Sequence, residues 1–158
     1  MAPILSPQSK TQQFLSFRLL PNTQAMVSTE QLTEVLSLSL AQIVPIPDVP
    51  PQVMGVCNWR GEVLWLVDLG YLLGFTPLFS QGYRQSNYSA IVLRHQDATL
   101  GLVVDQVGQM LWCSPEQIQP LAPGQLAPAL SHCAQGYWLD SQGIPFLILK
   151  GDAIVEQL

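Results

Sequence analysis

The chain has 158 residues, of which 48% are hydrophobic and 11% are charged. This length allows one sizeable core, or two small cores that share an interface. An average globular domain carries roughly 25% charged residues, so we expect much of this surface to be neutral or apolar, which favours protein partners. The net charge of -5 would repel a phosphate backbone, so nucleic acid is disfavoured as a ligand.

The amino terminus predicts a mobile tail. Residues 1–12 are rich in Ser, Pro and Gln and offer little that could pack, so we expect the domain to span residues 13–158. No positive region precedes an apolar stretch, and no apolar run approaches the roughly 20 residues that cross a bilayer. We therefore expect a cytoplasmic protein with no direct membrane insertion.

The first third of the chain predicts short strands. Residues 14–20 alternate with a period of two, which is typical of a half-buried strand with one face formed by Leu15, Phe17 and Leu19. Residues 28–31 have the Ser-x-x-Gln spacing of a capping box, which predicts one helical turn. Leucines alternate with serines over residues 36–40, which predicts another strand, with Glu34 on its opposite face or beside its rim.

A proline-rich connector leads into a predicted hairpin. Residues 44–51 contain four prolines, which fix extended geometry and remove backbone donors. Two apolar runs follow, residues 54–59 and 62–69, and Arg60-Gly61 separates them. Because Gly can supply the positive φ of a tight turn, the pair predicts a β-hairpin with Arg60 projecting from its tip.

The remainder predicts a second set of strands. Residues 70–74 indicate one helical turn, 80–87 a loop, and 120–136 show no clear periodicity. Strands are expected at residues 89–93, 100–105 and 110–113, a short turn at 114–117, a final hairpin over 137–149 and a helical tail over 152–158. Many short strands with little helix favour an all-β fold of two small barrels. Residues 66–70 weakly resemble 103–107, which mildly supports two similar lobes.

The cysteines do not indicate a framework or a zinc site. The chain has three of them, an odd number with no Cys-x-x-Cys spacing, so reduced and mostly buried thiols are expected. Cys57 could act as a nucleophile if His95 or His132 served as its base. It lies within an apolar strand, however, where alternation favours a packed structural thiol.

Aspartates and tryptophans are two further kinds of site candidate. Asp68, Asp105 and Asp140 could converge on a metal ion, but each lies at a strand end beside a turn, where Asp commonly accepts backbone N–H bonds. The four tryptophans all fall in predicted strands, and we expect most of them in the core. Trp59, next to Arg60, is the best candidate for an interface, where Trp and Arg are enriched.

Residues 46–69 resemble the CheW family of chemotaxis coupling proteins. They contain a Pro-rich approach, a Gly-Val-x-Asn-x-Arg-Gly hairpin and an apolar strand that ends in Val-Asp-Leu. The resemblance extends from the first strand to the closing one. It implies two five-stranded β-barrel lobes that share a hydrophobic core, with short helical turns, no catalysis and no cofactor.

The resemblance also implies partners and contact residues. It predicts an adaptor between the cytoplasmic tip of a chemoreceptor and the regulatory domain of a CheA-type histidine kinase, in chemotaxis or pilus-based motility. The partner-binding residues that it suggests are Glu34, Val35, Trp59, Arg60, Gly61, Val104 and Val107. Trp59 stands where the family usually has an aliphatic residue. A solvated pair between Glu34 and Arg60 would contribute only about 0 to 1 kcal/mol to folding, so we expect it to hold the guanidinium in a docking pose.

Two alternatives remain open at this point. One is a small thiol-dependent hydrolase that uses Cys57. The other is a divergent paralog that competes for the kinase without activating it.

Overall fold

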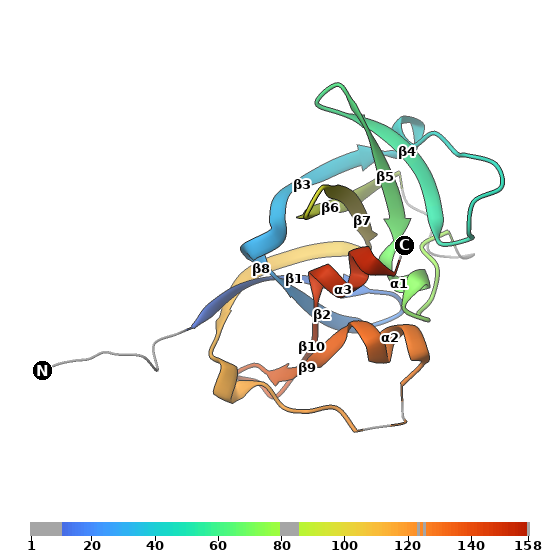
Figure 1. Ribbon diagram of the computed structural model, residues 1–158. Helices are drawn as coiled ribbons and strands as arrows, with labels where there is room; N and C mark the ends of the chain where they lie inside the picture. The colour runs from blue at the N-terminus through green and yellow to red at the C-terminus, as the bar shows by residue number, and fades with distance from the viewer. Residues whose placement is uncertain (1–10, 80–85, 123, 125, 158) are drawn as a thin grey trace, which may run out of the picture.

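The computed structural model describes residues 11–79, 86–122, 124 and 126–157, and in this part of the chain it has two five-stranded sheets (Figure 1). The first sheet, which we call lobe A, has the strand order β8-β1-β2-β10-β9. Its strands are β1 (Gln12–Leu19), β2 (Thr23–Ser28), β8 (Gln106–Cys113), β9 (Ala134–Leu139) and β10 (Pro145–Leu149).

The second sheet, lobe B, has the order β3-β6-β7-β5-β4. Its strands are β3 (Leu32–Ser39), β4 (Val53–Trp59), β5 (Glu62–Asp68), β6 (Asn87–His95) and β7 (Ala98–Val104). The helical segments are short: α1 (Leu69–Leu72), α2 (Pro128–Cys133), α3 (Gly151–Glu156), and the 3₁₀ turns η2 (Thr29–Gln31), η3 (Leu40–Gln42) and η4 (Pro115–Gln117).

The core of the molecule consists of three apolar clusters. The largest lies between the two sheets and includes Leu15, Phe17 and Val27 from lobe A and Ile91, Leu93 and Leu102 from lobe B. A second cluster fills the inside of lobe B, and a smaller one around Phe14 and Ile148 fills the inside of lobe A. The predicted pair of lobes with a shared hydrophobic core is therefore confirmed.

Each lobe is closed by the same local device. In lobe B, β3 ends in η3 and the next residues form an isolated bridge, Val44 with Val56 of β4. In lobe A, β8 ends in η4 and the chain forms the bridge Gln119 with Tyr137 of β9. Both turns have a Ser–Gln capping box. The two segments share the pattern Ser-x-x-Gln-Ile-x-Pro, at residues 39–45 and 114–120.

The closing device indicates an internal duplication with exchanged strands. Strands β1–β5 correspond in order to β6–β10, and β2 pairs in parallel with β10 as β7 does with β5. Each half of the chain contributes two strands to one lobe and three to the other. The resemblance between residues 66–70 and 103–107 has another origin: these segments overlap β5 and β7, which are neighbours within lobe B and not equivalent strands.

Several elements differ in detail from the sequence prediction. Strand β1 begins at Gln12, one residue before the expected start of the domain. Residues 1–10 of the predicted tail and 80–85 of the predicted loop lie outside the described residues. Residues 120–136 contain α2, which begins at Pro128. The segment shows no clear periodicity from which this helix could be predicted. Leu40 is exposed, because it belongs to η3 and not to β3.

We predict that Gly136→Ala destabilises lobe A. A Cβ at residue 136 would lie 2.4 Å from the carbonyl oxygen of Gln119, a backbone atom that forms the closing bridge. Overpacking of this kind costs about 1–3 kcal/mol. The measurement is the free energy of unfolding in urea, with Gln135→Ala on the same strand as the control. A loss no larger than that of the control would contradict the assigned role of the bridge.

Candidate functional site

The two edge strands of lobe B meet through side chains. Trp59, at the end of β4, donates its indole N–H to Glu34 Oε1 of β3 over 2.9 Å. Arg60 Nη2 lies 2.5 Å from the same carboxylate oxygen. The Arg60 guanidinium also lies over the Trp59 ring, 4.9 Å from its centroid, which is cation–π geometry. We call Glu34, Trp59 and Arg60 the seam.

The hairpin tip presents Arg60 to solvent. Arg60 and Gly61 have φ of 54° and 78°, the pair of positive values that a two-residue type I′ turn requires. The Asn58 side chain accepts the Gly61 N–H and supports this turn. The Arg60 side chain is 65% exposed, so the predicted projection from the tip is confirmed. Gly61 supplies backbone geometry, and in Figure 1 the β4–β5 hairpin extends away from lobe A.

Glu34 and Trp59 do not lie where the sequence placed them. Glu34 shares the inward face of β3 with Leu36 and Leu38, because residues two apart point to the same side of a strand. Trp59 is only 7% exposed and packs in the core of lobe B, so it is not an open contact surface. The Trp59 indole N–H donates to the inward-facing Glu34 carboxylate, and this hydrogen bond accounts for the positions of both side chains.

A second feature lies on edge strands β3 and β8. Val35 pairs with Ile91, and Met110 with Leu15, whose side chains belong to the core between the lobes. Val35 and Met110 therefore face the same inter-lobe side, but they are exposed because each lies on an edge strand. Strand β8 also contacts β6, the neighbour of β3. We call Val35, Val107, Met110 and Trp112 the rim surface.

A third feature is the outer face of the β4–β5 hairpin. Val63 is 69% exposed, and Trp65 is exposed beside the partly buried Val56, with which it pairs. These residues point away from the interior of lobe B, which Cys57, Leu64 and Leu66 fill. We call Val56, Val63 and Trp65 the hairpin surface. Strands β6 and β7 lie between it and β3 in the sheet.

Val104 does not lie where the suggested contact role requires. Its side chain is 0% exposed and belongs to the inter-lobe core, so it cannot touch a partner in this conformation. Val107 is partly buried against the same core and lies on the rim. Both residues flank the start of β8, but only Val107 is on the edge strand.

Sequence reasoning missed two contact candidates on the rim surface, as well as the residues of the hairpin surface. Trp112 is 60% exposed and Met110 is also exposed, whereas most tryptophans were expected in the core. The signal available was Gln106 and Gln109, two polar residues near the start of the strand that suit an exposed edge. Large apolar side chains on such a strand have no covering neighbour and indicate an interaction surface.

The candidate catalytic groups are not arranged for catalysis. Cys57 is buried in the core of lobe B, and burial raises the pKa of its thiol. His95 instead lies beside Gln31 and 3.4 Å from Glu156 on α3. A thiol with a raised pKa carries less thiolate at neutral pH and is a weaker nucleophile. The geometry gives no support to the hydrolase alternative.

The three aspartates have separate structural partners. Asp68 accepts the backbone N–H groups of Tyr71 and Leu78, although burial still raises the pKa of its carboxyl. Asp140 accepts two backbone N–H groups in the β9–β10 turn. Asp105 forms an ion pair with Arg18. Within the described residues no three His, Cys, Asp or Glu side chains are grouped as a metal site.

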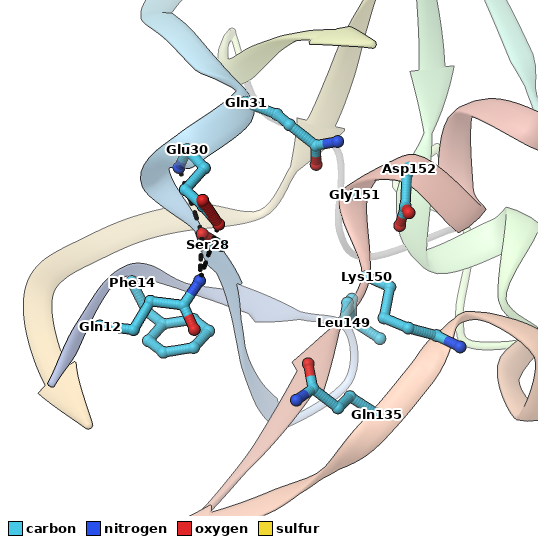
Figure 2. A pocket seen from close by; sticks show the side chains of 10 residues that line it. All are labelled: Gln12, Phe14, Ser28, Glu30, Gln31, Gln135, Leu149, Lys150, Gly151 and Asp152. Atoms are coloured by element: carbon cyan, nitrogen blue, oxygen red, sulfur yellow. Dashed lines mark hydrogen bonds between the residues drawn. The ribbon is translucent and has the colours of Figure 1, made fainter. Parts of the chain in front are cut away.

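Figure 2 shows a polar cavity of about 330 Å³ between β1, η2 and the start of α3. Gln12 Nε2 donates to Ser28 Oγ over 2.8 Å and lies 3.2 Å from Glu30 Oε2. The Lys150 side chain extends away from this group (Figure 2). Amides, a hydroxyl and a carboxylate that bond to one another make a structural network and offer no nucleophile with an adjacent base.

Two β lobes surround a shared core, with apolar side chains exposed on edge strands and an arginine exposed at a hairpin tip. The CheW-like domain model matches residues 13–158, and the chain therefore belongs to the CheW-like family. Two curated relatives are similar over part of their length: the chemotaxis protein CheW of Rhizobium meliloti (strain 1021), 36% identical over 76 residues, and the probable chemotaxis protein CheW of Rhizobium etli, 35% identical over 75 residues.

These matches cover 48% of this chain and 46% of each relative, so the aligned part spans about half the length of the curated relatives. The scaffolding protein TtCheW from Thermoanaerobacter tengcongensis has a similar crystal structure, with a TM-score of 0.73 over 89% of both chains at 20% identity. That likeness supports the fold. Among the described residues, no helix is both long and apolar enough to span a bilayer.

We predict that native Cys57 reacts slowly with iodoacetamide. Burial raises its pKa, so at pH 8 a smaller fraction is thiolate than for an exposed cysteine, and the sulfur is also shielded. Mass spectrometry should find labelling at Cys57 only after unfolding in guanidinium chloride. Rapid labelling of the folded protein at this residue would restore the hydrolase alternative.

Proposed function

We propose that this protein is a non-catalytic adaptor that couples the cytoplasmic tip of a chemoreceptor to the regulatory domain of a CheA-type histidine kinase in the cytoplasm. Membership of the CheW-like family supports a role as a scaffold in chemotaxis signalling. The particular partners and their contact residues are our proposal.

The observation that carries the proposal is the presence of separate exposed surfaces on two lobes that share one apolar core. The rim surface and the hairpin surface lie on either side of β6 and β7, and the inter-lobe core buries these two strands. A coupling protein must hold two partners at once, and two apolar surfaces that do not overlap allow this. Exposed apolar groups on folded modules commonly mark protein interfaces.

We assign the receptor tip to the rim surface together with Arg60. The rim joins Val35 and Val107, which the family resemblance suggests as contacts, with the exposed Met110 and Trp112. Arg60 adds a positive group that can bond a carboxylate or a carbonyl on the receptor, and Arg is a frequent interface anchor. The kinase regulatory domain is then assigned to the hairpin surface.

The alternative of a competing paralog differs from the adaptor in whether the kinase is activated. A competitor would bind the kinase through the same hairpin surface. An adaptor that activates must bind receptor and kinase simultaneously. Reconstitution of kinase activity with receptor and this protein separates the two: a rise in phosphorylation supports coupling, and a fall supports competition.

We predict that Arg60→Ala weakens binding to a chemoreceptor tip fragment by about tenfold, because a loss near 1.4 kcal/mol is typical of an interface arginine. Biolayer interferometry measures the affinity. Lys150→Ala is the control, since Lys150 is also an exposed cation but follows β10 in lobe A. Unchanged affinity with an intact fold would remove Arg60 from the recognition surface.

We predict that Val63→Glu weakens binding to the kinase regulatory domain about tenfold or more, because a charge would be buried against an apolar partner. Receptor-tip binding should be unchanged. Val63 is 69% exposed, so the melting temperature should move by no more than about 2 °C. If receptor binding fell instead, the assignment of the two surfaces would be reversed.

A further inference from the structure

We propose that Trp59 is a positioning residue that prepares Arg60 for receptor recognition without touching the receptor itself. The inference deepens the proposed function and rests on it, because Arg60 is assigned there to the receptor. It concerns a residue whose indole offers both a hydrogen-bond donor and an aromatic face.

The first step concerns access. Trp59 is 7% exposed and packs with Cys57 and Leu64 inside lobe B, so a partner cannot reach most of its ring. Its neighbour Arg60 is the exposed member of the seam. Any effect of Trp59 on binding must therefore pass through another side chain.

The second step concerns the carboxylate between them. Glu34 Oε1 accepts the Trp59 indole N–H at 2.9 Å and lies 2.5 Å from Arg60 Nη2. The indole belongs to a packed side chain, so its N–H fixes the carboxylate from the inner side of the sheet. A carboxylate held in this way gives the Arg60 guanidinium a single fixed position for its ion pair.

The third step concerns the guanidinium. Arg60 is held by the type I′ turn at its backbone, by Glu34 at Nη2 and by the Trp59 ring beneath it, 4.9 Å from the ring centroid. A free arginine loses rotamer entropy when it is ordered in an interface. Because Trp59 provides one of these contacts directly and supports a second through Glu34, it removes part of that cost before the receptor arrives.

The experiment is a double-mutant cycle on receptor-tip affinity with Trp59→Phe, Arg60→Ala and the double variant. Phe keeps a packed ring and removes only the N–H donor and part of the aromatic face. We expect Trp59→Phe to weaken binding about 3- to 10-fold when Arg60 is present, the range that ordering one long side chain implies. In the Arg60→Ala background the same change should have no effect.

The outcomes separate the inference from the proposed function. If Arg60→Ala weakens binding but Trp59→Phe has no effect, or has the same effect in both backgrounds, the positioning role is overturned and the adaptor function stands. If Arg60→Ala leaves binding unchanged, the proposed receptor contact fails and the inference fails with it. Trp59→Leu, the aliphatic change, should weaken binding at least as much as Trp59→Phe.

A second readout needs no receptor. The NMR signal of the Arg60 side-chain Nε–H should show greater mobility in Trp59→Phe, because the guanidinium loses an ordered carboxylate and stacking area. Trp138→Phe is the matched control, since Trp138 packs against Phe146 in lobe A and has the same ring change. An Arg60 signal that stays as ordered as in the unmodified protein would overturn the positioning role. So would an equal change in the control.

Discussion

The apolar core between the lobes is the constraint on which the other features of the molecule depend. It is built from one face of each sheet, and it covers β6 and β7 of lobe B almost completely. Because these central strands are covered, the described residues of β6 and β7 expose no large apolar side chain. One exposed set lies on the edge strands β3 and β8 and another on the β4–β5 hairpin, and further exposed apolar residues such as Val44 and Leu139 lie elsewhere. The geometry of burial thus leaves the rim surface and the hairpin surface exposed on either side of the two covered strands.

Lobe B also has to close at its open end. The isolated bridge of Val44 with Val56 joins the chain after β3 to β4, but the hairpin tip lies beyond the reach of that bridge. There the edges are joined by polar side chains instead, with Glu34 accepting the Trp59 indole N–H and forming an ion pair with Arg60. A carboxylate with these two partners is well satisfied despite its partial burial. Arg60 is therefore part of the closure of the lobe as well as part of its surface.

Much of this fold could be predicted from local pattern. The hairpin at Arg60-Gly61 followed from turn chemistry, and the short turn at 114–117 from its capping-box spacing. The pattern of short strands favoured two small barrels, and the resemblance to the family added their five strands each and their shared core. The strand exchange could not be read in this way, because it depends on contacts between segments far apart in the chain, although the repeated Ser-x-x-Gln-Ile-x-Pro pattern at 39–45 and 114–120 was available as a signal.

The site was harder to predict than the fold. Alternation assigns a residue to one side of a strand but does not tell whether a neighbour covers that side. Val104 and Met110 are both apolar residues of predicted strands, yet one is fully buried and the other is exposed, because β7 is central and β8 is an edge. Trp59 was expected at an interface for its position beside Arg60. It is buried instead, and Glu34 on the opposite edge strand accepts its indole N–H.

The exchange of strands has a consequence for the modularity of this protein. Neither lobe is a continuous stretch of sequence, since each takes two strands from one half of the chain and three from the other. Recombination between β5 and β6 would give two fragments that each lack part of both barrels. The rim and hairpin surfaces therefore cannot be shuffled into other proteins one at a time. An evolving lineage keeps or loses the two-surface body as a whole, and new specificity has to arise by point substitution within it.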